Sequence, residues 1–175
     1  MNSQDVILGL LMKGGLSGYD IKHRLESIFS YFYNASYGTI YPTLNKLEKE
    51  GFITKMSVIQ EGRPNKNVYT ITEEGRAQFS TYLKSPIEPN EFKSDVMTRM
   101  FFGEFLERDV ILGMLEDHLQ KARDDLNRLT DMYQACMPGM SPTQEICIQI
   151  GISNSKSVIE TLSQGIERLK KTNEK

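Results

Sequence analysis

The spacing of the apolar residues changes at Gly51, and this change restricts the fold more than any other feature of the chain. The apolar residues before it have spacings of four and three, typical of one face of an α-helix: Ile40, Leu44 and Leu47. After Gly51 the period becomes two, and residues 52–59 and 66–72 are predicted as strands. A turn-rich segment joins these strands into a hairpin. The sequence therefore predicts a helix that runs directly into a β-hairpin.

Two more helices are expected upstream. The first spans residues 5–13 and ends at two glycines, because its apolar residues share one face: Val6, Ile7, Leu10 and Leu11. The second starts at Ser17, which together with Asp20 forms a variant of the capping box. Its apolar face continues at helical spacing: Ile21, Leu25, Ile28 and Phe32. Residues 31–36 form a short polar and aromatic turn before the third helix.

Proline at position 42 leaves two starts open for the third helix. Proline cannot donate the hydrogen bond of a helix interior, and its ring clashes with the carbonyl four residues back. The helix either begins after Thr39 as its cap, with Pro42 in the third helical position, or begins near Ser36 and bends. At the other end, Gly51 is expected just past the helix, where glycine is favoured.

A fourth helix completes the N-terminal half. Thr72 is expected to cap it, two glutamates suit its first turn, and it ends before Pro86. Three helices, a strand, a basic turn and a second strand follow one another in the order of a winged helix-turn-helix fold. We therefore expect a winged helix domain in residues 1–85, followed by a linker over residues 85–90 with two prolines.

The C-terminal half, residues 91–175, is expected to be helical. A helix over residues 91–106 carries six large apolar residues: Phe92, Met97, Met100, Phe101, Phe102 and Phe105. The next helix has apolar residues at alternating spacings of three and four: Leu112, Leu115, Leu119, Ala122, Leu126, Leu129 and Tyr133. After a break at residues 137–143, a last helix repeats this seam. The fold class is therefore mainly α with a small β-hairpin, a winged helix-turn-helix domain followed by a helical, coiled-coil-like dimerisation domain.

A seam this narrow is typical of a coiled coil and needs a partner helix. We favour a second chain as that partner, from the family resemblance given below more than from the pattern itself, which places eight residues at a dimer interface: Leu112, Leu115, Leu119, Leu126, Leu129, Ile159, Leu162 and Ile166. The alternative is a monomeric hairpin, in which the seam packs on the last helix of the same chain.

Charge and composition exclude several classes of protein. The net charge of −2 argues against a general coat for nucleic acid, but residues 1–85 hold 10 Lys/Arg against 8 Asp/Glu, a balance of +2 that suits a module contacting a few phosphates. No apolar run predicts a membrane span and no signal peptide is expected, so we expect a cytoplasmic protein. Two cysteines and two isolated histidines make no metal motif. No catalytic constellation or cofactor loop stands out, so we expect neither an enzyme nor a cofactor.

Three segments match one set of motifs in the expected order. Residues 16–21 are LSGYDI, residues 38–53 are GTIYPTLNKLEKEGFI, and residues 62–76 are GRPNKNVYTITEEGR. Together they closely resemble the signatures of the PadR-like family of transcriptional regulators. The C-terminal half more loosely resembles the longer, virulence-activator-like helical domain of one subgroup. A departure is that family members often have a basic residue where Asn65 and Asn67 stand.

The resemblance implies a homodimeric bacterial transcription regulator, usually a repressor, that binds double-stranded DNA at a palindromic operator. Its expected partners are that DNA and a second copy of the chain, with a small aromatic effector as a further partner at an unknown site. Some relatives bind flat aromatic drugs between tryptophans, and this chain has no Trp, so that mode does not apply unchanged. The six apolar residues of the helix over 91–106 either line an effector cavity or, as we favour, fill a core. The alternative function is a protein-interaction module that keeps the winged helix fold without reading DNA.

The DNA-binding residues are expected on the third helix, the wing and the entry to the second helix. For base edges we expect Thr39, Tyr41 and Asn45, of which Asn45 can hydrogen-bond adenine. Five others are expected to hold phosphates: Tyr19, Ser36, Lys46, Arg63 and Lys66. The alternative for Tyr19 is packing at the helix entry, and for Tyr41 it is packing on the second helix. Lys49 also faces outward, but we expect it to pair with a neighbouring glutamate.

Overall fold

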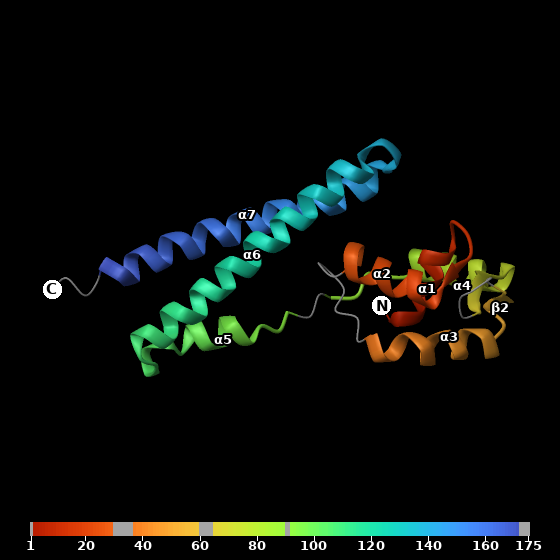
Figure 1. Ribbon diagram of the computed structural model, residues 1–175, viewed down its shortest axis with the longest axis horizontal. Coiled ribbons are helices and arrows are strands. Elements are labelled where there is room, and N and C mark those ends of the chain that lie inside the picture. The colour runs from red at the N-terminus through yellow and green to blue at the C-terminus, as the bar shows by residue number, and fades with distance from the viewer. Residues whose placement is uncertain (1, 30–36, 60–64, 90–91, 172–175) are drawn as a thin grey trace. The chain divides into compact units, whose positions relative to one another are not determined.

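The computed structural model describes residues 2–29, 37–59, 65–89 and 92–171. The chain forms two compact units, Met1–Asn90 and Glu91–Lys175, called unit 1 and unit 2 below (Figure 1). No helix in the described part of either unit is long and apolar enough to cross a membrane.

Unit 1 is built from four α-helices, two short helical turns and three strands within its described residues. In chain order these are α1 (Ser3–Leu11), β1 (Leu16–Ser17), α2 (Gly18–Arg24), a π-helical turn (Leu25–Phe29), a 3-10 turn (Tyr37–Thr39), α3 (Ile40–Lys49), β2 (Ile53–Val58), β3 (Lys66–Ile71) and α4 (Glu73–Lys84). The order of helices and hairpin strands confirms the predicted winged helix arrangement.

The caps of the first two helices set where they begin. α1 starts earlier than predicted because Asn2 caps it: the Asn2 side chain accepts hydrogen bonds from the N–H groups of Gln4 and Asp5, and the Asp5 carboxylate accepts the Asn2 N–H. The capping box predicted for Ser17 and Asp20 at α2 is confirmed. Phe32, at the end of the apolar face predicted for this helix, lies outside the described residues.

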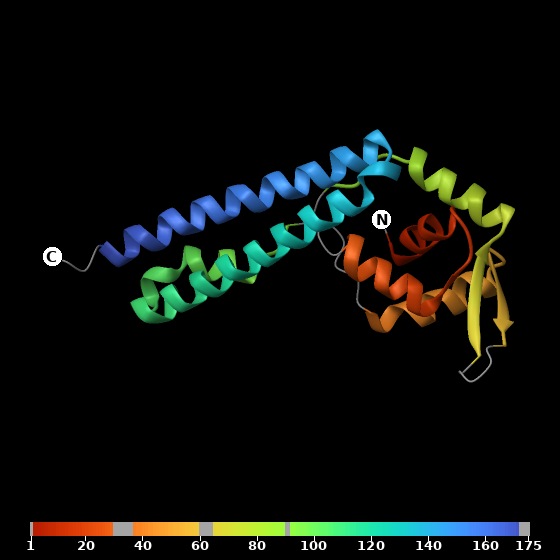
Figure 2. The ribbon, with the colours of Figure 1, turned by 45° about the horizontal axis from the view of Figure 1, so that its top comes forward.

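A third strand, β1, was not predicted. Leu16 pairs with Tyr69 and Ser17 with Val68, so the antiparallel sheet has the order β1-β3-β2. Figure 2 shows β2 and β3 as the adjacent strands of the hairpin. A strand of two residues is too short to show a period of two, so its pairing depends on a segment far along the chain.

One apolar core holds unit 1 together. The stripe predicted on α3 is confirmed, because Ile40, Leu44 and Leu47 are at most 3% exposed. They belong to one cluster with buried residues of α1, α2 and the sheet: Val6, Ile7, Leu8, Leu10, Leu11, Leu16, Ile21, Leu25, Ile53, Tyr69 and Ile71. This packing turns the opposite side of α3 toward solvent.

Gly51 ends α3 in the left-handed backbone region, with φ of 79°. The N–H of Phe52 donates to the carbonyl of Leu47 (2.9 Å), and the N–H of Gly51 donates to that of Glu48 (3.1 Å). These two bonds form the Schellman motif, which satisfies carbonyls that the helix leaves free. The predicted position of Gly51 is therefore confirmed.

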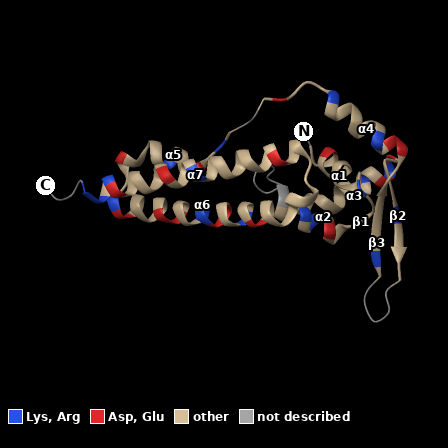
Figure 3. Ribbon diagram, turned by 90° about the horizontal axis from the view of Figure 1, so that it is seen from above, with Lys and Arg blue, Asp and Glu red and all other residues tan. Residues whose placement is uncertain are grey.

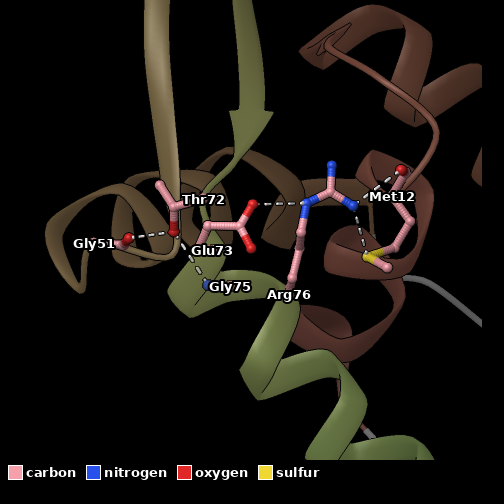
Figure 4. Close-up of polar contacts among 6 residues, drawn as sticks. All are labelled: Met12, Gly51, Thr72, Glu73, Gly75 and Arg76. Atoms are coloured by element: carbon pink, nitrogen blue, oxygen red, sulfur yellow. Dashed lines mark hydrogen bonds and ion pairs between the residues drawn. The ribbon is translucent and has the colours of Figure 1, made fainter.

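Thr72 joins the end of α3 to the start of α4, as Figure 4 shows. Its hydroxyl donates to the carbonyl of Gly51 (2.7 Å) and accepts the N–H of Gly75 (3.1 Å), which confirms it as the predicted cap. A Cβ at Gly75 would lie 2.1 Å from the carbonyl oxygen of Phe52, so only glycine allows this approach.

Arg76 ties the same corner to α1. Its guanidinium donates to the carbonyl of Met12 (3.4 Å) and lies 3.7 Å from the carboxylate of Glu73 (Figure 4). Polar contacts therefore join the end of α3, the start of α4 and the end of α1. The direction of α3 is fixed by its buried apolar face and by these contacts at its end.

Unit 2 consists of α5 (Asp95–Phe101), a 3-10 turn (Gly103–Phe105), α6 (Arg108–Cys136), a second 3-10 turn (Met137–Gly139) and α7 (Pro142–Lys171). The single helix predicted over residues 91–106 is wrong. α5 begins only after Ser94, whose hydroxyl caps the N–H of Met97, and it ends before Gly103, a poor helix former.

α6 and α7 run antiparallel and side by side (Figures 1 and 2). Polar contacts join them near both ends: the Tyr133 hydroxyl donates to Glu145 (2.8 Å), and Lys170 donates to Glu116 (2.6 Å). Between these contacts lies an apolar cluster: Leu115, Leu119, Leu162 and Ile166. Lys, Arg, Asp and Glu all lie along these two helices in Figure 3, as expected for faces turned to water.

The seam of α6 thus has its partner within the same chain, which is the alternative to the second chain that we favoured. Five of the eight residues assigned to a dimer interface are buried by this hairpin: Leu115, Leu119, Leu129, Leu162 and Ile166. The other three are half-buried: Leu112, Leu126 and Ile159. Within the chain α7 packs on α6 because it carries the same apolar spacing, and the assignment of these eight residues to a dimer interface stays a prediction.

Candidate nucleic-acid interface

The exposed face of α3 is the first part of the candidate site. Opposite the buried stripe stand five exposed residues: Tyr41, Pro42, Asn45, Lys46 and Lys49. The Asn45 side chain makes no hydrogen bond with any residue that the structure describes, so both the donor and the acceptor of its amide are available to a ligand. An α-helix with side chains is about 10–12 Å across, which fits a B-DNA major groove.

The start of α3 follows the first of the two predicted alternatives. Thr39 is the residue before the helix and Pro42 occupies the third helical position, so its missing N–H costs no helical bond. The 3-10 turn leads into the helix, and the Thr39 side chain makes no capping hydrogen bond. The Thr39 carbonyl instead accepts the hydroxyl of Thr43 (2.7 Å). Thr39 is exposed at the end of α3 where base contacts were predicted.

Tyr41 lies against the N-terminus of α2. A Cβ at Gly18 would lie 2.7 Å from the Tyr41 ring, so glycine at that position makes room for it. The Tyr41 side chain still remains 58% exposed. The predicted packing of Tyr41 on the second helix is therefore present, while its contact with a base edge stays a prediction.

Tyr19 does not pack at the helix entry, because it is 72% exposed. It lines an open depression of about 300 Å³ on α2 together with Asp20, His23 and Arg24. His23 and Arg24 were not predicted as site residues. Their signal was available in the helical spacing, which places residues 19 and 23 on one face.

The lysines of α3 pair differently from the prediction. Lys46 lies 3.8 Å from Glu50, and Glu48 lies 4.0 Å from Lys55 of β2. Within the described residues Lys49 has no ion pair, so the expected pairing of Lys49 with a neighbouring glutamate is wrong. Exposed pairs near 4 Å contribute at most about 1 kcal/mol, so Lys46 can exchange Glu50 for a phosphate.

Lys66, the first residue of β3, is held by Asp20 of α2. Its ammonium lies 3.1 Å from the Asp20 carboxylate, which also accepts the hydroxyl (2.7 Å) and N–H (3.0 Å) of Ser17. The two hydrogen bonds from Ser17, and to a smaller degree the Lys66 ammonium, lower the pKa of the Asp20 carboxyl to about 2, although its partial burial acts in the opposite direction. Asp20 is therefore a carboxylate at any physiological pH.

Two of the predicted phosphate contacts, Ser36 and Arg63, lie outside the described residues. Of the other six predicted DNA contacts, the structure brings Tyr19, Tyr41 and Lys66 toward the N-terminus of α2, and it places Thr39, Asn45 and Lys46 along α3. In the part of the chain that the structure describes, no three His, Cys, Asp or Glu side chains are grouped as a metal site.

Unit 2 carries a second feature of interest, an exposed apolar surface around α5. Of the six apolar residues expected to fill a core, only Met100 packs against the α6–α7 cluster. The other five are exposed, which corrects that expectation: Phe92, Met97, Phe101, Phe102 and Phe105. The rings of Phe101 and Phe102 meet edge to face with centroids 5.2 Å apart. Because large exposed patches mark interaction sites, we call these five residues the α5 surface and return to it below.

Comparison with known proteins gives concordant matches. Residues 7–81 match the model of the "Transcriptional regulator PadR-like family". The negative transcriptional regulator PadR of Bacillus subtilis is 37% identical over 138 residues, which cover 78% of this chain and 75% of that protein.

Solved structures match nearly the whole chain. A PadR-like transcriptional regulator from Bacillus cereus has a TM-score of 0.89 and 36% identity, over 98% of this chain and all of that one. Bacillus subtilis PadR in complex with operator DNA has a TM-score of 0.79 and 30% identity, over 95% of this chain and 98% of that one. The same regulator in complex with p-coumaric acid has a TM-score of 0.71 and 29% identity, over 96% and 98%.

Proposed function

The chain belongs to the PadR-like family of transcriptional regulators, and we propose that it acts as a homodimeric repressor that reads a two-fold symmetric operator with α3. As a member of this family it is a DNA-binding regulator and not an enzyme. The observation that carries the proposal is the exposed face of α3, where the Asn45 side-chain amide has no partner among the described residues and two exposed lysines lie beside it. Support for repression comes from the negative regulator of Bacillus subtilis, which covers most of the chain at 37% identity.

Four exposed residues of α3, and Thr39 before it, each have a role that their chemistry suits. The Asn45 amide can donate to and accept from adenine in the major groove. Thr39 and Tyr41, which are exposed near the start of the helix, are the other two proposed contacts with base edges. Lys46 holds a phosphate, because its pair with Glu50 is long and exposed. Lys49 is added to the phosphate contacts, since it lies at the centre of the exposed face without an ion pair among the described residues.

The homodimer is supported by the α5 surface rather than by the seam. Phe101 is 82% exposed and Phe105 is 77% exposed, which is unfavourable for a chain that stays alone in water. A second copy that covers this surface supplies the two-fold axis that a palindromic operator requires.

A small aromatic effector belongs to the same proposal. The α5 surface borders an open hollow of about 650 Å³, with Phe92, Met97, Phe101 and Phe102 among its lining residues. Aromatic and sulfur-bearing side chains of this kind suit a flat aromatic ligand. Support comes from the p-coumaric acid complex of the Bacillus subtilis regulator.

Gel shifts with the promoter upstream of the protein's own gene, at two salt concentrations, test DNA reading. We expect tighter binding to the promoter than to a scrambled duplex. Asn45→Ala should cost about 1–3 kcal/mol at one base pair, whereas Lys46→Ala should weaken all sequences alike. Equal affinity for scrambled DNA would remove the claim of sequence-specific reading. No DNA affinity, together with a co-purifying protein, would favour the interaction module.

Sedimentation of the wild type and of Phe101→Ser at several protein concentrations tests the dimer. We expect the wild type to sediment as a dimer, and the variant to be monomeric at protein concentrations at which the wild type is still a dimer. A monomeric wild type would contradict the dimer.

A thermal-shift screen of small aromatic acids tests the effector, with Phe92→Ser expected to abolish any shift.

A further inference from the structure

The contact between Asp20 and Lys66 joins two parts of unit 1 that are far apart in the chain. One carboxylate oxygen of Asp20 accepts from the Ser17 hydroxyl, the Ser17 N–H and the Lys66 ammonium. Ser17 is also a strand residue, paired with Val68 two residues beyond Lys66. The pairing of β1 with β3, the capping box of α2 and the ion pair therefore form a closed set of contacts, called the ring below, that links α2, β1 and β3.

This ring holds the hairpin at a particular place. Lys66 pairs with Val58, so it lies where β2 ends and β3 begins, next to the hairpin loop. The β1 pairing reaches only Val68 and Tyr69. The ion pair is thus the contact, among the described residues, that extends the attachment of β3 to α2 beyond the last β1 pair toward the loop.

Lys66 differs in this respect from the lysines of α3. Lys46 is 3.8 Å from a glutamate of its own helix, a contact that fixes no second element. Lys66 is 3.1 Å from a carboxylate that two further hydrogen bonds already orient.

We propose that Lys66 is a positioning residue and not a phosphate ligand: Asp20 holds it and thereby sets the direction in which the β2–β3 hairpin leaves α2. The inference rests on the proposed DNA-binding function and revises the role first assigned to Lys66. A lysine neutralised by Asp20 displaces no counterion from DNA, because it adds no net charge at the interface.

The salt dependence of operator binding separates the two roles. The full-length wild type is compared with Lys66→Met, Asp20→Asn, the double variant and Lys46→Met, by fluorescence anisotropy on the promoter duplex. Lys46→Met is the matched control for a phosphate ligand and should reduce the slope of log K against log salt by about 0.9. Lys66→Met should leave this slope unchanged and lower affinity by about two- to five-fold at every salt concentration.

The same measurements include a test of coupling. Asp20→Asn should lower affinity as much as Lys66→Met does, and the double variant should be no weaker than either single one. Asn can still accept the N–H of Ser17, so the cap of α2 survives, and circular dichroism checks this. Lys66→Arg keeps the ion pair and should restore wild-type binding.

Three results would overturn the positioning role. They are a slope reduced by about 0.9 in Lys66→Met, tighter binding by Asp20→Asn, or unchanged affinity in both single variants. A wild type without preference for the promoter would instead refute the DNA-reading function itself, which keeps the two failures distinct.

Discussion

Unit 1 and unit 2 bury their apolar residues in different ways. The seven largest side chains below 2% exposure all lie in unit 1: Ile7, Leu8, Leu11, Ile21, Leu44, Leu47 and Ile53. Unit 2 has a thin core between two long helices and leaves the rings of the α5 surface in water. Unit 1 therefore has a complete core by itself, whereas unit 2 has apolar area left over. The apolar area left over is why we propose self-association for unit 2, whereas DNA reading by unit 1 is proposed from the exposed face of α3.

Truncation of one apolar side chain in each unit should give the largest contrast. Leu44→Ala removes a fully buried side chain and should lower the free energy of unfolding by about 2–5 kcal/mol. Phe101→Ala removes an exposed ring and should cost less than about 0.5 kcal/mol within one chain. Urea denaturation at two protein concentrations measures both. A loss for Phe101→Ala that depends on concentration would support coverage by a second copy, while a large loss at every concentration would contradict the contrast.

Gly75→Ala should also destabilise unit 1 strongly. The new Cβ would lie 2.1 Å from the carbonyl oxygen of Phe52, which is backbone and cannot move without opening the corner between α3 and α4. We expect a loss of about 3 kcal/mol in the free energy of unfolding, the upper end for overpacking. Differential scanning calorimetry should show a lower melting temperature for the variant than for the wild type. An equal melting temperature would contradict the close approach between Gly75 and Phe52.

Acid should weaken unit 1 through Asp20. Its folded pKa of about 2 lies below the ordinary 3.8, so the carboxylate contributes stability that is complete above about pH 5 and is lost as pH falls toward 2. Because the Asp20 and Lys66 side chains are more than a third exposed, solvent screening limits this contribution to about 1 kcal/mol. Denaturation of the wild type and Asp20→Asn at pH 7, 4 and 3 measures it. The difference between them should shrink with acid; a constant difference would argue against the shifted carboxyl.

Gly113→Ala should have a small effect of the opposite sign in unit 2. A Cβ at Gly113, inside α6, meets no atom within 4 Å, so alanine should raise the free energy of unfolding by about 0.5–1 kcal/mol. The melting temperature of the full chain is the measurement. A lower melting temperature would indicate that another chain covers this part of α6, which would extend the self-association surface beyond α5.

Much of unit 1 could be predicted because its signals are local. The stripe of α3, the left-handed Gly51 and the caps Ser17 and Thr72 each depend on residues within a few positions of one another. The Asn2 cap is equally local but was missed, because the apolar stripe was taken to mark the start of the helix. The two-residue strand β1 carries no pattern of its own.

The candidate site was less predictable, since its partners come from other elements. The outward direction of Asn45 and Lys46 follows from the buried stripe on their own helix. The contact of Tyr41 with Gly18 joins α3 to α2, and that of Lys66 with Asp20 joins β3 to α2. Helical spacing placed Tyr41 on the outer side of its helix, and the strand prediction placed Lys66 beside the hairpin turn, but neither could indicate which neighbours the two residues touch.

The sequence by itself therefore determined the order of the four helices and two hairpin strands of unit 1, the outward face of α3 and the family, because periodicity, caps and motifs are properties of neighbouring residues. Only the tertiary structure decided three matters: α7 packs on the seam, the α5 surface is exposed in the single chain, and Asp20 pairs with Lys66. An apolar stripe indicates that a helix needs a packing partner but not which segment supplies it. A lysine forms an ion pair with whichever carboxylate the fold brings near it.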